Sequence, residues 1–329
     1  MHIAVPFFTV IFLVLIAYAG IEAAHLHVLF GIVIPYAAFT VFVLGFILRV
    51  RNWGRSPVPF RIPTTCGQQK SLPWIKASTV ENPSSTFGVI VRMALEILFF
   101  RSLFRNLKTE MHEDRVVYGS AKWLWLAGLA FHWSFLIIVI RHFRFFLGDI
   151  PFVLEMVEGL DAFLQIGAPL LYTTDIIILG AVTYLFLRRV AIPQLKYISL
   201  AADYFPLFLI FGIALSGVLM RYFFKVHVVG VKTLTMGWLS LSPVIPENVG
   251  VIFYIHLFLI SVLLAYFPFS KLMHVGGVFL SPTRNLINNN RMKRHVNPWD
   301  YPVHVHTYEE YEEEFRDKMK SVGLPVEKE

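Results

Sequence analysis

Residues 123–142 read WLWLAGLAFHWSFLIIVIRH, in which Arg141 is the one residue with a permanent charge. A run of this length is what an α-helix needs to cross about 30 Å of hydrocarbon. It carries two histidines, His132 and His142, ten residues apart. An imidazole nitrogen inside a bilayer needs a partner, and a haem iron is a suitable one. The stretch therefore predicts a membrane-spanning helix that offers two metal ligands.

A second apolar stretch further along the chain also carries two histidines. Residues 249–274 read VGVIFYIHLFLISVLLAYFPFSKLMH and contain His256 and His274, eighteen residues apart. If the two helices are antiparallel neighbours, His132 meets His274 near one leaflet and His142 meets His256 near the other. Four histidines on two helices at matched depths predict two irons, each held between both helices.

The two spacings cannot both be met by straight helices. At 1.5 Å per residue, His132 and His142 are separated by about 15 Å along the axis, whereas His256 and His274 are separated by about 27 Å. The second helix must therefore tilt or break, and Pro268 followed by Gly276-Gly277 offers a break.

The composition places the whole chain in a bilayer. Of its 329 residues 56% are hydrophobic and 16% are charged, and the mean hydropathy is +0.62, which is too apolar for a soluble domain. The expected fold class is all-α, a polytopic membrane bundle of about six helices. The expected spans are residues 3–20, 23–48, 123–140, 162–187, 204–220 and 249–270.

The basic residues predict how this bundle is oriented. Residues 49–122 contain twelve Lys and Arg, whereas residues 149–161 contain four acidic residues and no basic one. Because basic loops stay on the cytoplasmic side, we expect a multi-pass cell-membrane protein with both termini in the cytoplasm. The positive charge then faces membrane lipid, and no nucleic-acid partner is expected. Ala17-Tyr18-Ala19 also looks like a signal cleavage site, but no positive segment precedes it.

Four segments are expected along the chain. They are an N-terminal two-helix hairpin (1–48), a cytoplasmic connection (49–120), a four-helix haem-binding domain (121–280) and a cytoplasmic tail (281–329). Within the connection, Val89–Leu107 has the pattern of an amphipathic helix at the membrane interface, or alternatively of a docking element. The charged run Tyr308–Phe315 in the tail is typical of a solvated helix surface, and docking is again the alternative.

Several further residues are candidates for the haem sites. Gly128 lies one turn before His132 and would leave room for a flat macrocycle, as would Gly212 and Gly217, although glycine also packs helices together. Arg141 and Arg144 flank His142 and could pair with haem propionates, or anchor the helix at the interface. Cys66 is the one cysteine of the chain, so covalent attachment through a C-x-x-C-H motif is excluded and any haem is b-type.

The remaining histidines are expected to be solvated or interfacial. They are His2, His25, His27, His112, His227, His295, His304 and His306.

An H-x9-H helix followed by an H-x17-H helix resembles the gamma subunit family of respiratory nitrate reductases, di-haem cytochromes b that oxidise quinol. The resemblance covers roughly residues 26–280, with one additional helix in front. The tail from Ser281 to Asp300 departs from that family. It is closer to the DsrM family, the cytochrome b of the Dsr complex in sulfate reducers and sulfur oxidisers.

This resemblance implies two haem b groups and menaquinol or menaquinone. His142 and His256 would hold the outer haem beside the quinol, and His132 and His274 the inner haem. The implied partners are a cytoplasmic iron–sulfur subunit similar to heterodisulfide reductase and further membrane and periplasmic subunits, in dissimilatory sulfur metabolism. The direction of electron flow stays open.

Two alternatives stay open. The first is the cytochrome b of another quinone-linked oxidoreductase: a nitrate reductase, a formate dehydrogenase or a hydrogenase. The second is a proton-coupled transporter with histidine relays, for which the sequence offers no internal repeat.

An ionisable residue deep in a membrane is a functional candidate. Asp175 interrupts the fourth expected span about halfway along, so it is the first candidate for accepting a quinol proton, with a structural carboxyl as the alternative. Weaker candidates are Glu22, His25, His27, His227 and Lys232.

Overall fold

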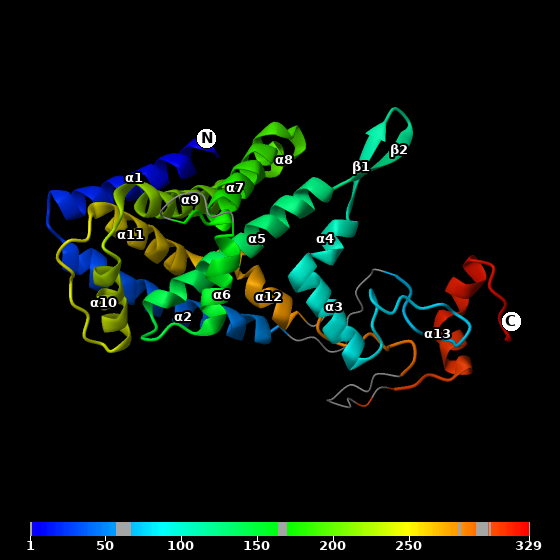
Figure 1. Ribbon diagram of the computed structural model, residues 1–329. Coiled ribbons are helices and arrows are strands. Elements are labelled where there is room, and N and C mark those ends of the chain that lie inside the picture. Colours follow the sequence, from blue (N-terminus) through cyan, green and yellow to red (C-terminus); the bar gives the residue numbers. More distant parts are fainter. Residues whose placement is uncertain are drawn as a thin grey trace.

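The computed structural model describes residues 2–56, 67–163, 170–281, 284–293, 302 and 304–328. Cys66 and much of the stretch from Ser281 to Asp300 lie outside these residues. The chain is predominantly helical, as expected, and Figure 1 shows its long helices side by side in a bundle. These helices are α1 (Ala4–Glu22), α2 (Ile34–Gly54), α5 (Lys122–His142), α7 (Thr173–Ala191), α9 (Ala201–Leu219) and α11 (Val251–Tyr266).

Five helical stretches of the described chain are long and apolar enough to cross a membrane, and they correspond to five of the six expected spans. They are Ala4–Glu22, Leu29–Gly54, Lys122–Phe145, Ala201–Phe224 and Val251–Phe269. The remaining expected span, the fourth along the chain, is α7, which is not among them because Asp175 lies in its first turn and Arg188 and Arg189 in its last. It packs within the bundle all the same, between α5 and α9.

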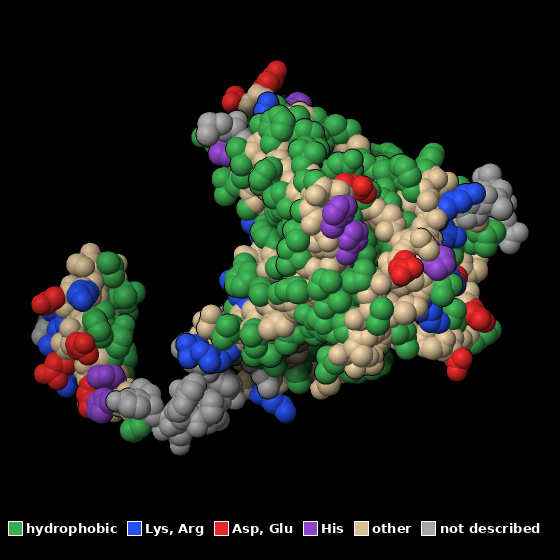
Figure 2. Space-filling model, turned by 90° about the vertical axis from the view of Figure 1, so that its left-hand side faces the viewer, with side chains coloured by type: hydrophobic (Ala, Val, Ile, Leu, Met, Phe, Trp, Pro, Cys, Tyr) green, Lys and Arg blue, Asp and Glu red, His purple; other side chains and the backbone are tan. Residues whose placement is uncertain are grey.

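Large apolar side chains cover the outside of the bundle. On α1, for example, Phe8 and Phe12 are 65% and 62% exposed. Figure 2 shows the end of the bundle that lies at the left in Figure 1, where hydrophobic side chains form much of the surface. The exposed apolar side chains along the helices suit contact with lipid, because apolar side chains have no penalty in hydrocarbon.

The interior of the bundle is built around α11. This helix packs against α1, α2 and α9, and Leu259 and Tyr254 are buried at its contacts. A short helix that the sequence did not predict, α10 (Val228–Leu239), covers one end of the core. It is tied to the second span because the Trp238 indole donates to the Gly31 carbonyl at 3.0 Å.

The sixth span breaks after α11, as the histidine spacing required. Two 3₁₀ turns, Phe267–Phe269 and Lys271–Met273, separate it from α12 (His274–Leu280). Pro268 cannot donate a helical hydrogen bond, and the Ser270 hydroxyl accepts instead from the Leu272 N–H at 3.1 Å. His274 therefore starts a new helix whose direction is independent of α11.

The fourth span begins later than expected. We predicted a helix over residues 162–187, whereas α7 starts at Thr173, and residues 164–169 are not described. The Asp161 carboxylate accepts from the backbone N–H and the hydroxyl of Thr174, at 2.8 and 2.6 Å, and so caps the new start. Asp161 itself ends α6 (Phe152–Asp161), a short helix in the acidic loop.

The expected interfacial helix over Val89–Leu107 is divided in the structure. It consists of α3 (Thr86–Phe99) and α4 (Arg101–Arg105), because Phe100 adopts a left-handed conformation with φ of 50° between them. The next residues form an unpredicted antiparallel hairpin of β1 (Leu107–His112) and β2 (Arg115–Ser120). Glu113, with φ of 53°, lies in its two-residue turn.

Two shorter helices complete the chain. The first, α8 (Pro193–Ile198), follows α7 directly, and the second, α13 (Tyr308–Ser321), forms the tail. Figure 1 shows α13 at the right of the molecule, on the same side as α3 and α4, whereas α10 lies at the left. The charged run Tyr308–Phe315 of the tail belongs to α13 and is therefore helical.

Candidate metal centres and the buried ion network

The first histidine pair joins the middle of α5 to the start of α12. The rings of His132 and His274 have their centroids 5.9 Å apart and their planes inclined at 82°. Phe100 and Phe131 pack edge-on against the His132 ring, with centroids at 4.9 and 5.0 Å. The structure thus brings together the two residues that antiparallel alignment paired.

The second pair joins the end of α5 to the second turn of α11. The rings of His142 and His256 have their centroids 6.3 Å apart and lie within 19° of parallel. Within the described chain, α5 and α11 are not among the closely packed helix pairs. Their histidine side chains face each other across the space between the two backbones.

All four imidazoles use the same nitrogen for a hydrogen bond. Nδ1 of His132 lies 2.7 Å from the Gly128 carbonyl, and Nδ1 of His142 lies 2.7 Å from the Ile138 carbonyl. Nδ1 of His274 lies 2.9 Å from the Lys271 carbonyl, and Nδ1 of His256 lies 2.9 Å from the Ser216 hydroxyl. A metal-bound histidine typically donates its other ring N–H to such an acceptor, which fixes the ring and its tautomer. Nε2 of each ring is therefore the nitrogen left for a metal.

These residues fit a haem iron between each pair. If one metal ion were bound by both rings of a pair, two metal–nitrogen bonds of about 2 Å and about 1 Å from each nitrogen to its ring centre would put the two centroids about 6 Å apart. The measured 5.9 and 6.3 Å agree with that separation. Neutral imidazole is also a common axial ligand of haem iron, so the donor set and the spacing point to the same group.

The glycines near the ligands have different surroundings. Gly128 contributes its carbonyl to His132, and a Cβ there would lie 3.7 Å from the Leu103 side chain. At Gly217, a Cβ would lie 3.4 Å from Cε1 of His256. Gly212 instead faces Leu259 and Val10, so it serves the packing of helices. Of the three, Gly217 is the one at which an added side chain would meet a ligand ring.

Arg141, one of the residues expected near a haem propionate, contacts two carboxylates of the protein in this structure. Its Nη2 lies 2.6 Å from Oδ1 of Asp175, and its Nε lies 3.1 Å from Oδ2 of Asp161. The side chains of Arg141, Asp175 and Asp161 are only 9, 12 and 2% exposed. We expected Asp175 halfway along a span, but the late start of α7 puts it in the first turn, where it can reach the end of α5.

Aromatic rings enclose this ion network. The Arg141 guanidinium lies over the Tyr172 ring at 3.7 Å, and that of Arg221 lies over the same ring at 4.0 Å. The Tyr222 hydroxyl donates to Oδ2 of Asp175 at 2.9 Å and accepts from the Tyr172 N–H at 3.0 Å. A π-helical turn at the end of α9, Met220–Phe224, carries both Arg221 and Tyr222.

The other predicted site residues have partners of their own. Arg144 donates from Nη1 to both carboxylate oxygens of Glu158 at 3.0 Å. Lys232 donates to the Gly148 carbonyl, and His227 accepts the Gly230 N–H at the start of α10. His27 packs edge-on against the Tyr254 ring and stacks with His25, and Glu22 is exposed at the end of α1.

Sequence reasoning missed Asp161, Ser216, Tyr172 and Tyr222 as members of these sites. The sequence shows Asp161 only as an acidic residue of a loop, because its role depends on contacts with other helices. Ser216 gave one signal, because it is a polar residue beside Gly217 within an apolar span. Nothing in the sequence indicates the roles of Tyr172 and Tyr222.

Comparison with known proteins adds independent findings. Residues 87–294 match the family described as the nitrate reductase gamma subunit. Over 280 residues the chain is 46% identical to the Hdr-like menaquinol oxidoreductase cytochrome b-like subunit of Archaeoglobus fulgidus, with 83% of this chain and 84% of the relative aligned. The subunit of the same name from Archaeoglobus profundus is 41% identical over 276 residues, with 81% of each chain aligned.

Proposed function

The chain belongs to the nitrate reductase gamma subunit family, and we propose that it is the di-haem cytochrome b subunit of a membrane complex that exchanges electrons with menaquinol. One observation carries this proposal: in each of two histidine pairs the ring centroids are about 6 Å apart, which suits one metal ion bound by both rings. Nδ1 of every ring is hydrogen bonded, which leaves Nε2 for the metal. The relatives are named for a menaquinol oxidoreductase, which supports the quinone as the electron carrier.

The ligands would be the Nε2 atoms of His132 and His274 at one site and of His142 and His256 at the other. A haem b bound in this way supplies reversible one-electron transfer. The chain's own task is to hold each ring at a fixed angle, which the four Nδ1 contacts do. Hydrogen bonding to Nδ1 also makes the imidazole more electron-rich, so Gly128, Ile138, Lys271 and Ser216 tune the sites.

We propose Asp175 as the group that takes a proton from the quinol. One guanidinium, that of Arg141, contacts two carboxylates, those of Asp161 and Asp175, and the Arg221 guanidinium lies over the Tyr172 ring beside them. Asp161 accepts hydrogen bonds from Thr174 with both of its oxygens, and its Oδ2 also lies 3.1 Å from Nε of Arg141. Asp175 is the more exposed of the two, and its second oxygen accepts a hydrogen bond from the Tyr222 hydroxyl. Arg141 precedes His142 directly, which brings the triad close to the outer ligand.

The partner we propose is a cytoplasmic iron–sulfur subunit similar to heterodisulfide reductase, with further membrane and periplasmic subunits, in dissimilatory sulfur metabolism. The relatives' designation as Hdr-like supports this choice over a nitrate reductase, a formate dehydrogenase or a hydrogenase. Both termini would be cytoplasmic. In that orientation, the basic residues 49–122, which include α3 and α4, lie on the partner's side of the membrane, together with His274.

Purification of the chain with its partners tests the proposal. We expect two haem b per polypeptide by pyridine haemochrome assay, and reduction of both by a menaquinol analogue. A histidine relay in a transporter predicts a colourless polypeptide instead, and a haem-free preparation that still folds would contradict the proposal. The identity of the co-purified soluble subunit separates the Hdr-like complex from the other quinone-linked complexes.

A further inference from the structure

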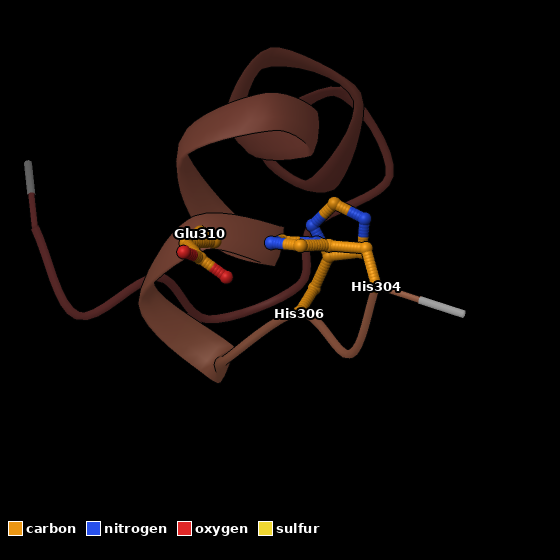
Figure 3. A group of neighbouring side chains, drawn as sticks. All are labelled: His304, His306 and Glu310. Atoms are coloured by element: carbon orange, nitrogen blue, oxygen red, sulfur yellow. The ribbon is translucent and has the colours of Figure 1, made fainter. Parts of the chain in front are cut away.

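A second group of potential metal ligands lies far along the chain from the four bundle histidines. His304, His306 and Glu310 each offer one ligand atom, and these atoms all lie within 4.8 Å of one another. The rings of His304 and His306 have their centroids 4.6 Å apart. Figure 3 shows the three side chains together at the start of α13, with the Glu310 carboxylate turned toward the imidazoles.

Local structure accounts for this grouping. His304 and His306 are two positions apart in a segment without helix, and side chains two apart in an extended chain point to the same side. Thr307 caps α13: its hydroxyl accepts the Glu310 N–H at 3.3 Å, and its own N–H donates to Oε2 of Glu310 at 2.9 Å. This capping box holds the Glu310 carboxylate near the residues that precede the helix.

We propose that His304, His306 and Glu310 bind a divalent metal ion of the zinc class. Two imidazoles and one carboxylate are a ligand set used for zinc, with a fourth position open to water or to a partner's side chain. Magnesium and calcium prefer all-oxygen surroundings, so they are poor competitors for this set. Exposed acidic residues follow on α13, among them Glu313 and Glu314, and they favour a cation nearby. Binding would tie the chain before α13 to its first turn.

Zinc binding to the intact, haem-loaded protein tests this proposal. The protein is purified in detergent without an oligohistidine tag, dialysed against zinc with excess magnesium, and analysed for zinc by mass spectrometry. We expect one zinc per chain, bound at least tenfold more weakly in Glu310→Gln and lost in His304→Ala/His306→Ala. Glu310→Gln is informative because glutamine also completes a capping box, so the helix start is kept.

Two matched variants serve as controls. Glu313→Gln removes an exposed carboxylate of α13 outside the group, and His25→Ala disrupts the other H-x-H pair, whose rings stack 6.3 Å apart. Both are expected to bind zinc like the parent protein. In parallel, hydrogen exchange over residues 304–312 is expected to slow when zinc is added. The proposal is overturned if the parent protein binds no zinc, or if the His304/His306 double variant binds it equally well.

Discussion

Nη2 of Arg141 lies 2.6 Å from Oδ1 of Asp175, although the two residues belong to different helices and are 34 positions apart. Because Arg141 is followed directly by His142, this contact connects the end of the haem-ligand helix α5 to the carboxylate proposed as proton acceptor. The same guanidinium also holds Asp161. Substitution of Asp175 therefore tests proton transfer, whereas substitution of Arg141 tests the stability of the protein.

Replacing Asp175 by asparagine removes the proposed proton acceptor but keeps a side chain of the same shape. We expect both haems to be retained and the reduction of haem by a menaquinol analogue to slow by about 100-fold, the usual effect of losing a general base. Stopped-flow absorbance measures this rate. Glu155→Gln, an exposed carboxylate on α6, is the control and should keep the parent rate. An unchanged rate in Asp175→Asn would remove Asp175 from the mechanism.

Replacing Arg141 by alanine leaves two buried carboxylates without their cation. We expect the protein to lose about 3–5 kcal/mol of stability, as when one partner of a buried ion pair is removed. Arg144→Ala is the matched control, because the Arg144–Glu158 pair is more exposed, at 35 and 17%, so its loss is expected to cost less. Unfolding in detergent mixtures compares the two variants. Equal losses would contradict the structural importance given to Arg141.

Ser216 accounts for the Nδ1 contact of His256, at 2.9 Å. We expect Ser216→Ala to change the reduction potential of one haem and to weaken its retention by about 10-fold or more, as is typical for outer partners of metal ligands. Ser261→Ala removes another buried hydroxyl, one that donates to the Leu257 carbonyl of its own helix at 2.8 Å. Redox titrations of both variants should show a shift for Ser216→Ala alone. A shift in both would point to a general packing effect.

Gly217 is the glycine whose added side chain would press on a ligand ring. A Cβ added at Gly217 would lie 3.4 Å from Cε1 of His256. The larger side chain of Gly217→Leu would therefore displace the imidazole. We expect this variant to lose one haem of two. Gly180→Leu is the control, because a Cβ at Gly180 meets nothing within 4 Å. Retention of both haems in Gly217→Leu would show that the His256 ring does not need its present position.

The histidine pairs could be predicted from the sequence because two simple quantities determine them. The lengths of the apolar runs give the spans, and matching the depths of the histidines on two antiparallel spans gives the partners. The unequal spacings even required the interruption that the structure has between Tyr266 and His274. Local rules and the thickness of a bilayer were sufficient for this part of the site.

The ion network could not be predicted in the same way. Arg141 meets Asp161 and Asp175 through a tertiary contact, and the late start of α7 depends on a cap that Asp161 provides from another helix. Apolar composition alone extended the fourth span too far toward its start. The division into α3 and α4 was not predicted because the amphipathic pattern continues through Phe100, where the backbone turns left-handed.

Haem content of paired double variants tests the central claim most directly. In each preparation the haem-to-polypeptide ratio is measured by pyridine haemochrome assay, with the retained secondary structure as a check on folding. His142→Ala/His256→Ala removes both ligands of one site and is predicted to keep one haem per chain. His142→Ala/His274→Ala removes one ligand from each site and is predicted to keep none. A cross-pair variant that keeps a full haem, or a same-pair variant that loses both, would contradict the ligand pairing.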